Sequence, residues 1–274
     1  MSFASSPLSR RHTRPRRLTV LDAETPRATA GARLRRIRFG GPDLHDFPDM
    51  GPGAHIKLFV PEPGAEAVLP VMSAQGPQWP EGPRPAARTY SVRSLDAANG
   101  TLDVEFVLHG GNGPASRWAA EARVGDSLGL AGPGGPPLLR RDAEFFLLAG
   151  DLSALPAIAA VLEQLPPTAS GVALIEADPP LPLVHPPALQ LHWLGSGQTS
   201  PLPEAVRALQ WPTDSRPVSA TVAGESDAVM AIRRHLRRDR QLPRDALYAV
   251  PYWRRGHSEE QYHEQRHELM DQDS

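Results

Sequence analysis

Apolar and polar positions change their spacing near Glu144. Up to Arg140 the apolar segments are short, β-like and separated by Gly and Pro. These segments are LTVL (18–21), ARLRRIRF (32–39), HIKLFV (55–60), LPVM (69–72), RTYSVRS (88–94), LDVEFVL (102–108) and DSLGLAG (126–132). Many short strands separated by turn residues predict an antiparallel Greek-key barrel, with its one clear helix at residues 115–122.

After Glu144, apolar strands alternate with amphipathic helices. The expected strands are EFFLLAG (144–150), GVALIEA (171–177), LQLHWLG (189–195), VSATVA (218–223) and ALYAVPY (246–252), and the expected helices are SALPAIAAVLEQL (153–165), PLPEAVRALQ (201–210) and ESDAVMAIRRHLRRD (225–239). Strands that alternate with helices predict a parallel sheet covered on both faces. Ligands of such sheets bind at the carboxyl ends of the strands.

These patterns predict a β + α/β chain of three parts. Residues 1–17, rich in Ser, Arg and Pro, are expected to be a disordered basic arm, with an RNA- or membrane-binding arm as the alternative. Residues 18–141 form the barrel domain, in which the Pro- and Gly-rich stretch 61–87 is expected to be a long loop around one short strand. Residues 142–274 form an α/β domain with a C-terminal helix.

Residues 88–116 combine three features that suit a flavin dinucleotide. Arg88 offers a planar charged fork to a phosphate, Tyr90 on the same strand face offers a ring to a flavin, and Ser91 offers its hydroxyl. After the turn at 99–100, residues 102–108 are expected to return as a half-buried strand. Next comes the sequence HGGNGPAS (109–116), where glycines allow close approach to a pyrophosphate and a helix begins with free N–H groups. The residues expected to hold FAD are Arg88, Tyr90, Ser91, Arg93, His109, Gly113, Pro114, Ala115 and Ser116.

The chain resembles the siderophore-interacting, FAD-dependent ferric-siderophore reductases, which are ferredoxin-reductase-like flavoproteins. The matching segments cover nearly the whole chain in order: AHIKLFVP (54–61), RTYSVR (88–93), FVLHGGNGPASRWA (106–119), GDSLGLAGPGG (125–135), LLAGDLSALPAIAAVLEQLP (147–166), VAGE (222–225) and, loosely, 238–256. The resemblance implies an FAD-binding barrel followed by an NAD(P)H-binding-like domain.

Two turns of the second domain are candidates for an NADPH or NADH site. Residues 149–154 follow its first strand, where Ser153 is expected to cap the next helix. Without a G-x-G-x-x-G pattern, an ordinary capped turn is an equally good interpretation from the residues alone, and the resemblance favours nucleotide binding. Family members commonly have Glu-Thr where this chain has Leu-Ser at 152–153. The expected nucleotide-binding residues are Gly150, Asp151, Ser153, Ala154, Gly224 and Glu225.

The single lysine of the chain, Lys57, is expected on the solvent face of strand 55–60. With Arg254 or Arg255 it is a candidate docking site for an anionic ferric siderophore, although a solvated strand lysine is an equally good interpretation. His263 and His267 have the i, i+4 spacing of metal ligands, but with no clear third ligand a solvated helix is favoured and no metal is predicted.

Composition excludes several kinds of site and partner. The net charge of −2 does not indicate a nucleic-acid partner, and zero cysteines exclude disulfides and cysteine-ligated iron–sulfur clusters. No apolar run approaches the roughly 18 residues of a membrane span, and a cytoplasmic location is expected.

We therefore expect an FAD enzyme that reduces ferric siderophores with electrons from NADPH, NADH or a ferredoxin, and that uses no catalytic side chain for acid–base work. The alternatives are a general NAD(P)H:flavin or ferredoxin-type reductase and a non-catalytic flavin- or siderophore-binding module.

Overall fold

The computed structural model describes residues 14–29, 32–49, 51–74, 76–109, 113–178, 180–214 and 216–257, together with Tyr262. The chain divides into two compact units after Gly135, except that residues 28–31 group with the second unit. The sequence-based boundary, at 141/142, lies six residues later than this division.

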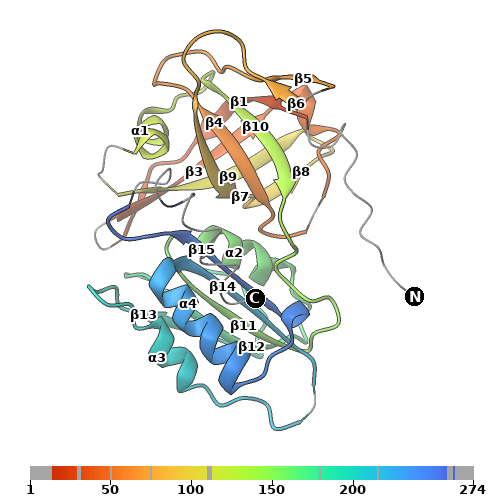
Figure 1. Cartoon of the computed structure of the whole chain (residues 1–274), viewed down its shortest axis with the longest axis vertical. Helices are drawn as coiled ribbons and strands as arrows, with labels where there is room; N and C mark the ends of the chain where they lie inside the picture. The colour runs from red at the N-terminus through yellow and green to blue at the C-terminus, as the bar shows by residue number, and fades with distance from the viewer. Residues whose placement is uncertain are drawn as a thin grey trace. The chain divides into compact units, whose positions relative to one another are not determined.

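The first unit is built on an eight-stranded antiparallel sheet with the order β7-β4-β10-β1-β3-β9-β8, and β2 pairs with β3 (Figure 1). A separate hairpin joins β5 to β6. The strands are β1 (Arg16–Ala23), β2 (Arg27–Thr29), β3 (Ala32–Gly40), β4 (His55–Val60), β5 (Val71–Ser73), β6 (Gly76–Gln78), β7 (Ala86–Ser91), β8 (Ser94–Asp96), β9 (Thr101–Leu108) and β10 (Ser127–Gly134).

This sheet curls because its two ends are neighbours in the chain. β7 and β8 are at opposite ends of the strand order, yet only residues 92 and 93 separate them. The curled sheet encloses an apolar core to which the inward positions of β3, β4 and β9 contribute. Helix α1 (Pro114–Glu121) contributes Trp118 to it, 2% exposed and stacked on Phe39 with 6.2 Å between ring centroids. The predicted barrel-like sheet and its helix are thus confirmed.

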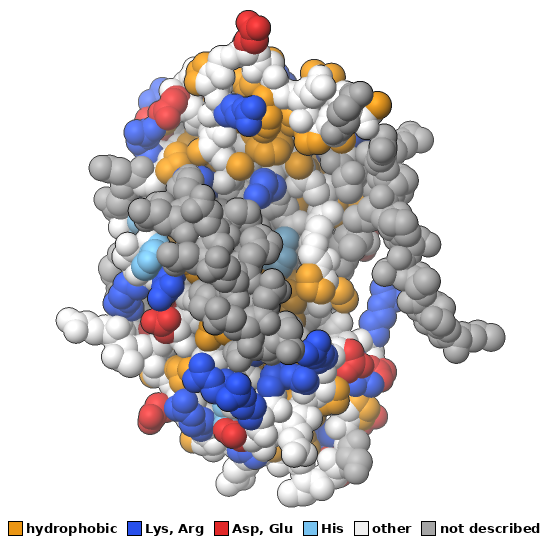
Figure 2. Space-filling model, in the orientation of Figure 1, with side chains coloured by type: hydrophobic (Ala, Val, Ile, Leu, Met, Phe, Trp, Pro, Cys, Tyr) orange, Lys and Arg blue, Asp and Glu red, His pale blue; other side chains and the backbone are white. Residues whose placement is uncertain are grey.

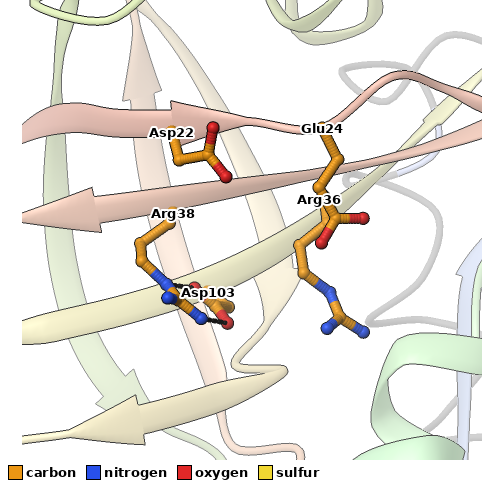
Figure 3. Close-up of a pocket in the computed structure, with 5 residues that line it drawn as sticks. All are labelled: Asp22, Glu24, Arg36, Arg38 and Asp103. Carbon is orange, nitrogen blue, oxygen red and sulfur yellow. Dashed lines mark hydrogen bonds and ion pairs between the residues drawn. The ribbon is translucent and has the colours of Figure 1, made fainter.

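The outer face of β9 differs from the half-buried strand expected. Asp103 and Glu105 are each only 4% exposed, because arginines cover them. Arg36 and Arg38 of β3 lie directly opposite Glu105 and Asp103, and Arg38 Nε donates to Asp103 Oδ1 at 2.8 Å. Figure 3 shows part of this charged face, where a pocket of about 100 Å³ is lined by Asp22, Glu24, Arg36, Arg38 and Asp103. The pocket is smaller than the several hundred Å³ typical of sites for organic ligands.

Other local expectations for the first unit need correction. β1 begins at Arg16, which is fully buried and lies over the Phe47 ring, so the disordered arm was extended too far; residues 1–13 of that arm lie outside the described residues. The stretch 61–87 contains two short strands rather than one. The strand expected over 88–94 is divided between β7 and β8, and β2 was not predicted.

The second unit is a five-stranded, fully parallel sheet with the order β13-β12-β11-β14-β15. Its strands are β11 (Phe145–Asp151), β12 (Ser170–Glu176), β13 (Leu189–Leu194), β14 (Val218–Glu225) and β15 (Leu247–Trp253). Helix α2 (Leu155–Gln164) covers one face, while α3 (Leu202–Arg207) and α4 (Ser226–Arg234) pack on the other (Figure 1). Strand–helix alternation predicted this parallel sheet correctly.

The helices are shorter than the apolar spacing predicted. α4 ends at Arg234 and continues as one π-helical turn, η2 (His235–Asp239); single 3-10 turns, η1 (Pro42–Leu44) and η3 (Arg244–Ala246), occur elsewhere. The expected C-terminal helix lies outside the described residues apart from Tyr262. Within the described part of the chain, no helix combines the length and apolarity needed to span a bilayer.

The Asp103 carboxylate on the outer face of the first unit makes the free energy of unfolding depend on pH. Burial alone would raise the pKa of Asp103, but hydrogen bonds from Arg38 and Ser94 outweigh it and hold that pKa below its ordinary value. The ionised carboxylate therefore stabilises the fold above the unfolded-state pKa of about 4, and this stabilisation is lost as the pH falls through the lower folded-state pKa. We expect Asp103→Asn to lower the free energy of unfolding at neutral pH and to flatten its decline between about pH 5 and about pH 2.

Urea unfolding at a series of pH values measures both effects. Asp245→Asn, which alters a carboxylate that is 72% exposed, is the matched control and should leave the pH profile unchanged. Parallel profiles for the wild type and Asp103→Asn would contradict the prediction.

Candidate functional site

In the first unit, the register of β7 against β4 determines which side chains share a face. Arg88 lies opposite Leu58 and Tyr90 opposite Ile56, and directly paired residues of antiparallel strands project to the same side. Arg88 and Tyr90 are therefore on the inner face of the curled sheet, both partly exposed. The Tyr90 ring packs on Phe106, with 4.6 Å between centroids. A cation and a supported aromatic ring thus lie two residues apart on one face, as expected.

The first turn of α1 has the features that suit an anion. Gly113 precedes the helix, Pro114 occupies its first turn, and that turn contains no acidic residue and no side-chain cap. Helix geometry leaves the N–H groups of Ala115 and Ser116 outside the helix's own hydrogen bonds. The N–H of Arg117 is not available to a ligand, since it donates to Gly113 O at 2.9 Å. Residues 110–112 of the glycine-rich stretch lie outside the described residues.

His109 follows β9 and is exposed beside this turn. Its ring lies 3.6 Å from the place where a Cβ on Gly113 would be, so a side chain there would occupy the approach to the helix start. Together with Arg88 and Tyr90, these groups fit a flavin dinucleotide: a cation and N–H donors for phosphates, and a ring for the flavin.

Arg93 and Ser91 lie away from this face. Arg93 is buried on the outer side, where its Nε is 3.7 Å from Glu105 Oε2, so the structure brings it to a carboxylate of the charged face rather than to Arg88. Ser91 lies opposite His55, on the side of Lys57 and Thr89, and is 6% exposed. Lys57 is partly exposed on β4 while Ile56 and Leu58 are buried, as the alternation predicted.

In the second unit, Asp151 connects three strand ends. It closes β11, is 9% exposed, and accepts four hydrogen bonds. Its Oδ2 accepts from Glu225 N at the end of β14 and from Trp253 Nε1 at the end of β15, each at 2.8 Å. Its Oδ1 accepts from Ser153 N and from Ser153 Oγ at 2.8 and 2.6 Å. The carboxyl edge of the sheet is thereby held in a fixed arrangement.

Two glycines allow this arrangement. At Gly224, where φ is +133°, a Cβ would lie 2.6 Å from Asp151 Oδ2. At Gly150 a Cβ would lie 2.6 Å from Ala154 Cβ and 2.7 Å from Ala223 O. Internal packing thus requires glycine at both positions, irrespective of any nucleotide.

Ser153 and Glu225 differ in their capping roles. Ser153 does not cap α2, contrary to expectation, because Ala154 is the N-cap and the Ser153 hydroxyl is bonded to Asp151. Glu225 does cap α4: its Oε2 accepts from Asp227 N at 2.7 Å and Ala228 N at 3.3 Å. Its Oε1 accepts from Arg255 N at 3.2 Å. A carboxylate of the chain therefore already occupies the anion position of α4.

Sequence reasoning missed two participants at this edge. Trp253 is 39% exposed, and its indole N–H donates to Asp151. Glu176, the last residue of β12, is 8% exposed and accepts from the Ser200 hydroxyl. Its position at the carboxyl end of a parallel strand was the available signal. Burial raises the pKa of Glu176, and the charge of Asp151 acts in the same direction.

The cationic candidates of this unit are Arg254 and Arg255. Arg255 is exposed, and its Nη2 lies 3.4 Å from Gly197 O; Arg254 is partly buried. Figure 2 shows basic side chains gathered over the α4 region. Arg237 donates to Leu242 O, and Arg240 lies over the Trp211 ring, so part of this basic face supports the fold. The metal candidates His263 and His267 lie outside the described residues.

Comparison with solved structures shows which class of protein has this fold. A ferredoxin-NADP+ reductase from Plasmodium falciparum shares the fold, with a TM-score of 0.57 at 13% identity over 83% of this chain and 94% of that one. The siderophore-interacting protein SipS from Aeromonas hydrophila aligns with a TM-score of 0.79 at 37% identity, covering 94% of this chain and 99% of its own.

Sequence comparisons agree. Residues 25–137 match a siderophore-interacting FAD-binding domain, and residues 143–256 match the siderophore-interacting protein model. Ferric vibriobactin reductase ViuB of Vibrio cholerae serotype O1 is 41% identical over 247 residues, 88% of this chain and 91% of ViuB. An NADPH-dependent ferric-chelate reductase of Escherichia coli K12 is 33% identical over 250 residues, 89% and 94% of the two chains. The chain belongs to the siderophore-interacting protein family.

The four hydrogen bonds of Asp151 predict a large stability effect. Asp151→Ala leaves the Glu225 N–H and the Trp253 indole N–H without their acceptor, and we expect it to lower the free energy of unfolding by about 2–4 kcal/mol. Urea unfolding measures the change, with Glu204→Ala, at a side chain 90% exposed, as the control. A loss no larger than that of the control would show that Asp151 does not hold the strand ends.

Proposed function

We propose that the protein is an FAD-dependent oxidoreductase that reduces ferric siderophores and so releases iron as Fe(II). The observation that supports this most is the combination of Arg88 and Tyr90 on one face of β7 with the acid-free start of α1. Family membership and the names of the two reductase relatives support the ferric substrate. Reduction lowers the affinity of hard oxygen ligands for iron, which allows its release.

Each part of the proposed FAD site has a distinct task. Arg88 and the N–H groups of Ala115 and Ser116 hold phosphates, while Gly113 leaves space for their approach. Tyr90, supported by Phe106, positions the flavin ring, and we assign no FAD contact to Ser91, which is buried on the opposite face. When bound, FAD accepts two electrons from a hydride donor and passes them on singly. We assign no side chain to acid–base catalysis.

The proposed electron donor is NADPH or NADH, bound at the carboxyl edge of the second sheet. Parallel sheets of this kind bind nucleotides there, and residues 150–154 with Gly224 and Glu225 form that edge. The name of the Escherichia coli relative supports a nicotinamide donor. We retain ferredoxin as the competing donor to be tested.

Anaerobic mixing of the FAD-loaded protein with each donor tests this function. We expect NADPH or NADH to bleach the flavin, and a ferric siderophore to restore its absorbance as Fe(II) appears. Bleaching by reduced ferredoxin alone would refute the nicotinamide donor. Equal turnover with free flavin would favour a general reductase, and absence of turnover with every donor would favour a binding module.

The phosphate role of Arg88 predicts a loss of FAD affinity. Arg88→Ala should weaken FAD binding by about 1.5–3 kcal/mol, the range for a hydrogen bond to a charged group. Titration of the apoprotein with FAD measures this, and Arg84→Ala, on the exposed part of the preceding loop, is the control. Unchanged affinity in Arg88→Ala would refute the assignment.

We also propose that Lys57 docks anionic ferric siderophores. An exposed cation raises the local concentration of an anionic substrate. Lys57→Ala should raise the KM for an anionic ferric siderophore about threefold to tenfold, roughly 0.7–1.4 kcal/mol, and flatten its salt dependence. Flavin reduction by the donor should not change.

Steady-state kinetics at two salt concentrations measure the effect, with Arg33→Ala as the exposed cation control. Identical kinetics for neutral and anionic complexes in every variant would rule out docking by Lys57.

A further inference from the structure

Glu176 occupies the position in the second sheet from which a dinucleotide's ribose is usually read. The strand order makes β11 the first strand and β12 the second, and Glu176 ends β12 in register with Asp151. In doubly wound sheets the pyrophosphate lies over the turn after the first strand. Where that turn carries a G-x-G-x-x-G pattern, an acidic residue at the end of the second strand hydrogen-bonds the ribose 2′-hydroxyl of NAD, whereas NADP sites provide an arginine for the 2′-phosphate. This chain lacks the glycine pattern but has an acidic residue at the same strand position.

The Glu176 carboxyl group is held in place for such a role. It accepts from the Ser200 hydroxyl and interacts with the backbone of Gly197, so the loop after β13 fixes it at the corner between β12 and β13. One carboxyl oxygen, Oε2, takes the Ser200 bond, and a carboxylate has lone pairs for further donors. A ribose hydroxyl is such a donor.

The charges around this corner disfavour a 2′-phosphate. Residues 177–200 contain no Lys or Arg, in a chain with 29 basic residues. Arg255 brings one guanidinium to Gly197, but the carboxylates of Asp151 and Glu176 oppose it. Burial is the main cause that raises the pKa of Glu176, and the nearby charge of Asp151 acts in the same direction. A further anionic group at this corner would be disfavoured by the same two effects.

We propose that Glu176 accepts a hydrogen bond from the 2′-hydroxyl of the adenosine ribose of NADH, and that the protein consequently prefers NADH to NADPH. This preference rests on the proposed nicotinamide donor and adds its specificity. It sets this chain apart from the Escherichia coli relative whose name specifies NADPH.

Two measurements on the FAD-loaded protein test the preference. Anaerobic flavin bleaching gives kcat/KM for NADH and NADPH, and calorimetry gives the Kd of ADP-ribose and of 2′-phospho-ADP-ribose, which cannot donate a hydride. We expect NADH and ADP-ribose to be favoured by about tenfold or more, roughly 1.4 kcal/mol. Glu176→Gln, which keeps the size and an acceptor for Ser200, should reduce both ratios, mainly by improving the phosphorylated ligands.

Glu204→Gln is the charge-matched control, since it removes a carboxylate that is 90% exposed on α3 of the same unit, and it should preserve both ratios. A wild type that favours NADPH, or ratios that Glu176→Gln leaves unchanged, would overturn the inference while the reductase function stands. If ADP-ribose binds more tightly than 2′-phospho-ADP-ribose but neither NADH nor NADPH bleaches the flavin, the ribose contact of Glu176 is supported and the nicotinamide donor is refuted. If neither ligand binds, both proposals are wrong.

Discussion

The carboxylate of Asp151 is the interaction on which the second unit's functional edge depends. Four hydrogen bonds connect it to the turn after β11, to the end of β14 and to the indole of Trp253 on β15. Gly224 must lack a side chain because that carboxylate occupies the space. The positions of Glu225 and, through its backbone, Arg255 follow from the same arrangement. The edge is therefore fixed by internal bonds before any ligand arrives, which is the condition for discriminating between similar ligands.

In the first unit, the alternation of apolar and polar residues along β4, β7 and β9 determines which side chains lie together on one face. Apolar residues on the inner face fix the register, so Arg88 and Tyr90 are directed together to the side of Ile56 and Leu58. The outer face is closed by arginine–carboxylate pairs, among them Arg36 with Glu105 and Arg38 with Asp103. These pairs leave few free charges on β9, while the cation proposed for FAD phosphates lies on the other face. The arginines that pair with carboxylates therefore lie on the outer face, whereas Arg88, the candidate FAD-binding residue, lies on the inner face.

The sequence predicted elements well wherever local periodicity determines structure. The strand–helix alternation depends on neighbouring residues, and the boundaries follow closely: α1 begins at Pro114, one residue before the predicted 115–122, and β14 extends to Glu225, two residues beyond the predicted 218–223. It could not predict partners distant in the chain. Arg93 was expected to contact FAD, but the pairing of β8 with β9 brings it to Glu105. A local competition was missed as well: Ser153 was expected to cap α2, but its hydroxyl donates to Asp151, two residues earlier. Trp253 and Glu176 escaped notice because their roles arise from residues 102 and 24 positions away.

The central claim is that this chain couples a two-electron donor to a one-electron ferric acceptor through FAD, and a single-turnover stoichiometry tests it most directly. The flavin of the purified protein is reduced anaerobically by light, with no nucleotide present, and then mixed with excess ferric siderophore and a colorimetric Fe(II) chelator. The account predicts about two Fe(II) released per FAD as the flavin reoxidises. Reduced flavin that persists in the presence of the ferric complex, with no Fe(II) formed, would contradict it.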